Sequence, residues 1–274
     1  MKKKIKFILI TLVIAIVLEL GAIIAIQAHK IFTETVQQST TEEAKGQVKT
    51  KDKKDKLPDK DTATPPSSSD ITEPAKPELG PVDESYFDDA VFLGDSRTVG
   101  LRAFGSFANS DYFAKTGISV NSFFMYPALD EETGLTLTQT LSYKQYKKIY
   151  IMIGVNDAAL VPLENFEDQF FDAIREIQLL QPNAIIYVQS ILGVTKNKEL
   201  GDSYHYNNER VLERNALLKS KCDGEKLVYL DVFSVFSDAE GYLNPFNSSD
   251  GLHLNSSDYN IWCDYLMQHA LPVN

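Results

Sequence analysis

Five short apolar runs, each bounded by turn-forming residues, most strongly constrain the fold of this chain. They lack the alternation of apolar and polar residues that is typical of a strand with one solvated face. We therefore expect strands that are buried on both faces. The five predicted strands are Ala90–Leu93, Tyr112–Ala114, Ile149–Ile153, Ala184–Val188 and Leu227–Leu230.

Segments with helical periodicity separate these strands. The clearest is Leu163–Leu180, where apolar residues recur at steps of three and four. Further helices are predicted over Ser96–Phe104, Ser203–Lys221 and Ser256–His269. Strands that alternate with helices predict an α/β fold, in which a parallel sheet carries helices on both faces. Reactive side chains in such folds gather at the carboxyl ends of the strands.

The chain before the predicted sheet begins with a segment of membrane-spanning character. Residues 1–30 open with a lysine cluster and continue with the apolar run Phe7–Ile26, whose only charge is Glu19. About 20 helical residues span the hydrocarbon core of a bilayer, and the lysines favour a cytoplasmic N-terminus. We therefore expect a single-pass signal anchor in the cell membrane, with the rest of the chain extracellular. A signal peptide cleaved after Ala28 is the alternative.

Residues 31–81 are rich in Lys, Asp, Thr, Ser and Pro, which predicts a disordered linker, or stalk, before one domain at 82–274. The whole chain carries 27 Lys and Arg against 38 Asp and Glu, a net charge of −11. This acidic balance argues against nucleic acid as a partner. Two cysteines, Cys222 and Cys263, are too few for a four-cysteine zinc site, and their spacing leaves open whether they pair.

Two strand ends carry residues that suit acyl-transfer chemistry. In Gly94–Ser96 a strand ends and a helix begins, so Ser96 lies at a helix N-terminus, where backbone N–H groups stabilise negative charge. In Gly154–Asp157, Asn156 can donate a side-chain N–H to an oxyanion. Local roles also explain both motifs, because Asp95 or Ser96 can cap the helix and Asn is common in turns.

A third motif, Asp250-Gly-Leu-His253, lies near the end of the chain. Its two-residue gap allows the carboxylate to orient the imidazole, while His253 takes the proton of a serine. His205, three residues after Asp202, is the rival base. A different interpretation is that the side chains of the three motifs converge on a cation. Its ligands would be Asp95, Asp157, Asp250 and His253.

Together, GDS at 94–96, GVND at 154–157 and DGLH at 250–253 resemble the motifs of the SGNH (GDSL-like) hydrolase superfamily, over residues 88–270. The resemblance implies a three-layer α/β/α sandwich of the flavodoxin-like type, with about five parallel strands. It implies Ser96 as the nucleophile, His253 as the base and Asp250 as the partner of that base.

The resemblance also implies an oxyanion hole formed by Ser96, Gly117 and Asn156. Arg97 stands where the name-giving motif has Leu, which suggests a cation beside the substrate. We count Arg97, Asp157 and His205 as candidate substrate-binding residues.

The mechanism that follows is ester hydrolysis through an acyl-enzyme, which needs no metal or cofactor. A domain tethered outside a membrane can reach acylated carbohydrate, so we expect removal of small acyl groups, such as acetyl, from cell-surface or cell-wall glycans. The polar and aromatic stretch Ile191–Tyr206 either lines a sugar site or is a plain surface loop. Acyl transfer to a glycan by the same triad, and a non-catalytic glycan-binding domain, are the alternatives.

Overall fold

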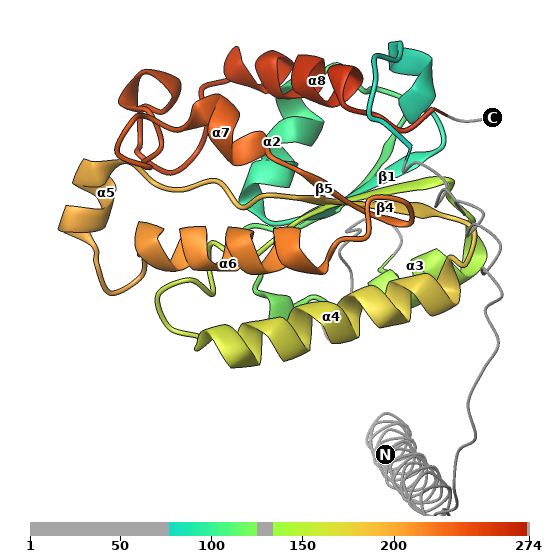
Figure 1. Cartoon of the computed structure of the whole chain (residues 1–274), viewed down its shortest axis with the longest axis horizontal. Helices are drawn as coiled ribbons and strands as arrows, with labels where there is room; N and C mark the ends of the chain where they lie inside the picture. Colours follow the sequence, from blue (N-terminus) through green and yellow to red (C-terminus); the bar gives the residue numbers. More distant parts are fainter. Residues whose placement is uncertain (1–76, 125–133, 273–274) are drawn as a thin grey trace, which may run out of the picture. The chain divides into compact units, whose positions relative to one another are not determined.

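The structure, a computed structural model, describes residues 77–124 and 134–272 (Figure 1). A parallel sheet of five strands lies at the centre, in the order β2-β1-β3-β4-β5. This is the flavodoxin-like order, and it confirms the predicted parallel sheet. The strands are β1 (Ala90–Gly94), β2 (Asp111–Ala114), β3 (Lys148–Met152), β4 (Ile185–Gln189) and β5 (Leu227–Leu230).

Helices cover both faces of the sheet, which gives the three layers (Figure 1). On one face lie α3 (Leu137–Tyr143), α4 (Leu163–Leu180) and α6 (Asn208–Lys221). On the other lie α2 (Ser96–Phe104), α7 (Val232–Phe236) and α8 (Asp258–Gln268). Four shorter elements are α5 (Lys196–Gly201) and the 3-10 helices η1 (Glu84–Phe87), η2 (Val120–Ser122) and η3 (Pro245–Asn247).

Successive strand residues point to opposite faces and so build two cores. In β1, Val91 and Leu93 belong to the core beneath α4 and α6, whereas Ala90 and Phe92 belong to the core beneath α2 and α8. All five residues of β1 and of β3 are buried. Burial on both faces explains why these strands appear in the sequence as unbroken apolar runs.

An aromatic row crosses four strands on the α2–α8 face. Phe92 pairs in register with Tyr112 and with Tyr150, and Tyr150 pairs with Tyr187. The ring centroids of these pairs are 5.1, 4.8 and 4.5 Å apart, with nearly parallel planes. Such stacked neighbours stabilise a sheet beyond the area that they bury.

The predicted strand boundaries agree with the observed ones to within one residue, but one helix start was wrong. The segment predicted as a helix from Ser203 becomes helical only at Asn208, because the Asn207 side chain accepts from the Arg210 backbone N–H at 2.9 Å and caps α6 there. The stretch Ile191–Tyr206, predicted either to line a sugar site or to be a plain surface loop, contains the short helix α5.

The predicted membrane anchor at 1–30 and nearly all of the predicted stalk at 31–81 lie outside the described residues. Within 77–124 and 134–272, no helix combines the length and the apolarity that crossing a bilayer requires.

Candidate active site

The GDS motif places Ser96 at the carboxyl end of β1, as the first residue of α2. Asp95 caps this helix, because its Oδ1 accepts from the Arg97 backbone N–H at 3.0 Å. The strand must end in glycine: a Cβ on Gly94 would lie 2.3 Å from the Met152 carbonyl oxygen and 2.2 Å from Thr98 Oγ1. The helix cap and the glycine together fix where the serine hydroxyl leaves the sheet.

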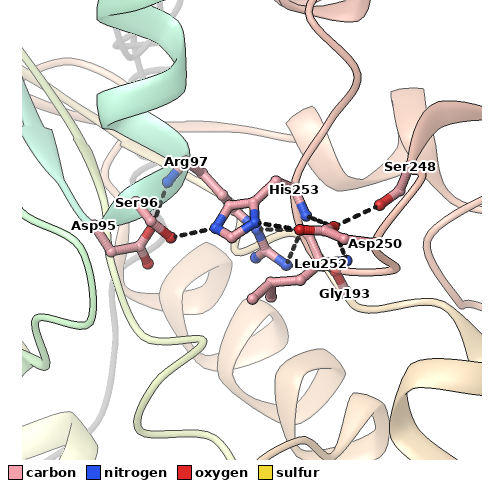
Figure 2. Close-up of polar contacts among 8 residues, drawn as sticks. All are labelled: Asp95, Ser96, Arg97, Gly193, Ser248, Asp250, Leu252 and His253. Atoms are coloured by element: carbon pink, nitrogen blue, oxygen red, sulfur yellow. Dashed lines mark hydrogen bonds and ion pairs between the residues drawn. The ribbon is translucent and has the colours of Figure 1, made fainter.

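His253 and Asp250 lie beside this serine (Figure 2). His253 Nε2 is 2.9 Å from Ser96 Oγ, and His253 Nδ1 is 2.7 Å from Asp250 Oδ2. The sequence therefore brings together, from positions 157 residues apart, a hydroxyl, an imidazole and a carboxylate within hydrogen-bonding reach. This is the arrangement through which a base activates a serine and a carboxylate orients the base.

The turn that carries the pair is closed by Asp250 itself. Its Oδ1 accepts from the backbone N–H groups of Leu252 and His253, both at 2.8 Å, and from Ser248 Oγ at 3.2 Å. Gly251 adopts φ +80°, where a side chain would be strained, and a Cβ there would lie 2.6 Å from Thr195 Oγ1. Ser248 is a supporting residue that the sequence analysis missed, since a serine two residues before an aspartate is a common turn feature.

The charge of Asp250 is stabilised where it stands. Partial burial opposes ionisation, but the hydrogen bonds from the His253 ring and from the backbone N–H groups of His253 and Leu252 outweigh it. They hold the pKa of Asp250 well below its ordinary value. The carboxylate is therefore ionised over the whole range in which an imidazole can act as a base, and it can stabilise the imidazolium.

The three predicted oxyanion donors lie on strand ends and turns at the same edge of the sheet. Gly117 has φ +75°, and its backbone N–H has no acceptor among the described residues. Asn156, after β3, donates from Nδ2 to the Ile118 carbonyl oxygen at 2.8 Å, which ties it to the turn of Gly117. The second N–H of this amide and the N–H of Ser96 are the other two donors that the predicted oxyanion hole requires.

Asp157 lies beneath this turn with its side chain buried, which corrects its assignment as a substrate-binding residue. It is 1% exposed, and its Oδ2 accepts from the Val120 backbone N–H at 3.2 Å. Burial raises the pKa of Asp157 to about 6, although the Val120 hydrogen bond and the nearby Arg214 oppose the shift. Arg214, which is fully buried, donates to the carbonyl oxygens of Asp157 and Val161.

The sequence analysis missed Arg214. Its signal was present in the sequence of α6, because Arg214 stands at helical spacing between the apolar residues Val211 and Leu218, and the structure buries all three. An arginine in an apolar stripe indicates a buried guanidinium with polar partners.

Arg97 is also buried, at 1% exposure, and its guanidinium faces backbone carbonyl groups (Figure 2). It donates to Leu252, Leu192 and Gly193. A side chain so placed has no free face for a substrate, so its assignment as a substrate-binding cation is corrected.

His205 does not join the Ser96 site through any contact among the described residues. Its Nδ1 lies 2.8 Å from Asp202 Oδ1 on the surface, where the imidazole is 57% exposed. The hydroxyl of Ser96 pairs with His253, so the rival assignment of His205 as the base has no geometric support.

Within the described ranges, no three His, Cys, Asp or Glu side chains are grouped so that they can hold a metal ion. The cation site envisaged from Asp95, Asp157, Asp250 and His253 is therefore not formed there. Cys222 and Cys263 are both free thiols in the structure, Cys263 being buried in α8.

The sequence profile of the GDSL-like lipase/acylhydrolase family matches residues 92–261, a range that contains all three motifs. No curated protein sequence matches the chain. A candidate platelet activating factor from Streptococcus pneumoniae has 20% identity and a TM-score of 0.52, with 67% of this chain and 88% of that one covered. A candidate acylhydrolase from Bacteroides fragilis has 18% identity and a TM-score of 0.51, with 69% and 87% covered. These two likenesses show the fold.

Proposed function

The chain belongs to the GDSL-like lipase/acylhydrolase family, and from that premise we propose that it is a serine ester hydrolase that removes small acyl groups from carbohydrate. The observation that carries the proposal is the continuous chain of contacts from Asp250 through His253 to Ser96, with distances of 2.7 and 2.9 Å. A helix cap alone explains Asp95, but it does not explain an imidazole aimed at the serine hydroxyl.

The reaction follows from the roles of the three side chains. Ser96 Oγ attacks the ester carbonyl carbon while its proton passes to His253 Nε2, and Asp250 stabilises the imidazolium. The carbonyl oxygen becomes an oxyanion that accepts from the Ser96 and Gly117 backbone N–H groups and from Asn156. His253 then protonates the leaving alcohol. Water, deprotonated by the same imidazole, attacks the acyl-serine; the bond to Ser96 Oγ then breaks, His253 returns the proton to that oxygen, and the acid is released.

The proposed substrate class rests on two features, one for the size of the acyl group and one for the location of the ester. The described residues include no long apolar helix over the site that could shelter a fatty chain, and the N-terminal apolar run favours a position at the outer face of the cell membrane. Acetyl esters on cell-surface or cell-wall carbohydrate are the small esters within reach of such an anchored domain. We place the catalytic domain outside the cell on this argument.

The test is an esterase assay on the full chain with Ser96→Ala as the control. We expect nitrophenyl acetate to be cleaved faster than a long-chain nitrophenyl ester, and a fluorophosphonate probe to label Ser96. The Ser96→Ala variant should lose both the labelling and about 10⁶-fold in kcat. Wild-type turnover in that variant would refute the assignment of the nucleophile.

The same experiment separates the alternatives when acetylated oligosaccharide is the substrate. Release of free acetate indicates hydrolysis, whereas acetyl groups that appear on an added acceptor sugar indicate transfer. A protein that binds the oligosaccharide, takes no probe and cleaves no ester is a glycan-binding domain.

A further inference from the structure

Arg97 is a buried cation that the proposed mechanism does not use. It follows Ser96 directly in the first turn of α2, and it is among the largest fully buried side chains of the described domain. Burial lowers the pKa of its guanidinium, although the nearby Asp95 opposes the shift. Burying a charge costs several kcal/mol unless good hydrogen bonds compensate, so the contacts of this residue reveal what it does.

The contacts converge on the peptide that precedes His253. Arg97 Nε and Nη2 both donate to the Leu252 carbonyl oxygen, each at 3.2 Å. The N–H of that same peptide, on His253, donates to Asp250 Oδ1 at 2.8 Å. The peptide plane is therefore held at its oxygen by Arg97 and at its nitrogen by Asp250 (Figure 2).

The other donors of the guanidinium hold the segment that follows β4. Nη2 donates to the Gly193 carbonyl oxygen at 2.6 Å, and Nη1 donates to that of Leu192. This segment also binds the loop of residues 248–253, called the base loop below, directly. The Thr195 N–H donates to the Gly251 carbonyl oxygen at 2.9 Å. A single guanidinium thus joins the start of α2, the segment after β4 and the loop of the base.

We propose that Arg97 is a positioning residue that fixes the distance between His253 Nε2 and Ser96 Oγ. The inference rests on the proposed function and goes further by naming the part that sets its geometry. The Asp250 turn is closed by its own hydrogen bonds, so it remains intact as a unit without Arg97. What the guanidinium fixes, together with the Thr195–Gly251 hydrogen bond, is the position of this turn relative to the nucleophile. Its planar fork binds three carbonyl groups in a fixed geometry that an ammonium does not reproduce.

The experiment compares Arg97→Met and Arg97→Lys with the wild type in the full chain, purified in detergent. Methionine keeps much of the length and loses every donor, and lysine keeps the charge and loses the fork. We expect kcat to fall about 100-fold in Arg97→Met, because small displacements of reacting groups cost that much, with KM changed less than about twofold. The rate of fluorophosphonate labelling should fall in parallel, and Arg97→Lys should recover little of either.

A structural signature distinguishes positioning from a general loss of stability. The proton NMR resonance of the His253 Nδ1–H should persist in Arg97→Met, because the contact with Asp250 lies within the turn. The matched control is Lys148→Met, which removes a cation that is 4% exposed and pairs with Asp89 at the opposite end of the strands. It should lower the melting temperature and leave kcat unchanged.

Three results would overturn the inference: wild-type kcat in Arg97→Met, full recovery in Arg97→Lys, or an equal loss of kcat in Lys148→Met. If Arg97→Met does not fold, Arg97→Lys decides alone: a reduced kcat supports the inference, and an unchanged kcat overturns it. A wild-type protein that cleaves no ester and takes no probe would instead refute the proposed function, and the two failures are therefore distinguishable.

Discussion

The loop that carries Asp250 and His253 reaches the same edge of the sheet as the turns that carry Gly117 and Asn156, but the two regions are held in different ways. In the base loop, the side chains of His253 and Asp250 are 36% and 53% exposed, and the turn is fixed by hydrogen bonds. In the turns of Gly117 and Asn156, called the oxyanion turns below, the flanking residues Ile118, Val120 and Val155 lie in the core beneath α4 and α6.

Each region has its own buried arginine, and the two differ in what they join. Arg97 lies beside the nucleophile and reaches residues 155 positions away in the base loop. Arg214 reaches from α6 to Asp157 and Val161, on the segment that leads out of β3. The geometry of the base therefore depends mainly on polar contacts, with Leu252 only packed against the edge of that core, whereas the oxyanion turns place Ile118, Val120 and Val155 within it. Substitutions in the base loop should change rate more than stability, and those in the oxyanion turns should change both.

The largest effect that tests this contrast is expected for Asp250→Asn. The Asn oxygen can keep the two backbone N–H groups that Oδ1 now binds, so its NH₂ would face His253 Nδ1. Nδ1 must then accept, which places the ring proton on Nε2 and prevents it from taking the serine proton. We expect kcat to fall about 10⁴-fold with the melting temperature nearly unchanged.

The matched control for this variant is Asp202→Asn. It alters an Asp–His pair of the same spacing, with an oxygen–nitrogen distance of 2.8 Å, that does not contact Ser96. Its kcat should equal that of the wild type. Equal losses in the two variants would remove the distinction between His253 and His205 as the base.

A smaller effect, shared between rate and stability, is expected for Asn156→Ala. Loss of one oxyanion donor typically lowers kcat about 10²- to 10³-fold, and here the variant also loses the 2.8 Å bond to the Ile118 carbonyl group. Kinetics and thermal unfolding measured on the same samples should both change, with KM nearly constant. Asn183→Ala, at an exposed asparagine after α4, is the control. An unchanged kcat would exclude Asn156 from the oxyanion hole.

The contrast between the two regions also explains which parts of the site the sequence could predict. The strands were predictable because burial on both faces leaves unbroken apolar runs. Ser96, Asn156 and the pair Asp250–His253 were predictable as candidates because each follows a strand or closes a short turn, which is local information.

The long-range partners were not predictable in this way. Arg97 binds carbonyl groups of Leu192, Gly193 and Leu252, and every residue type offers the same carbonyl oxygen. The sequence therefore holds no record of which carbonyl groups a buried guanidinium selects, and an arginine beside the nucleophile was wrongly assigned to the substrate. The start of α6 was misplaced for a local reason, since Ser203 and Asn207 are both good caps and the structure uses Asn207.

The smallest expected effect concerns the pH dependence of stability in the oxyanion turns. Burial raises the pKa of Asp157 to about 6, above the ordinary value of 3.8, so the folded state favours the protonated form. Below pH 3.8 this group therefore leaves the free energy of unfolding unchanged. As the pH rises through 6, its ionisation lowers that free energy by on the order of 3 kcal/mol. Asp157→Asn keeps an oxygen for the Val120 N–H and removes the charge. Its free energy of unfolding, relative to wild type, should rise between pH 4 and pH 7, as measured by urea denaturation at several pH values.

A difference that stays flat over this range would mean that the carboxylate is already compensated by Arg214, so that electrostatics, in addition to packing, holds the oxyanion turns.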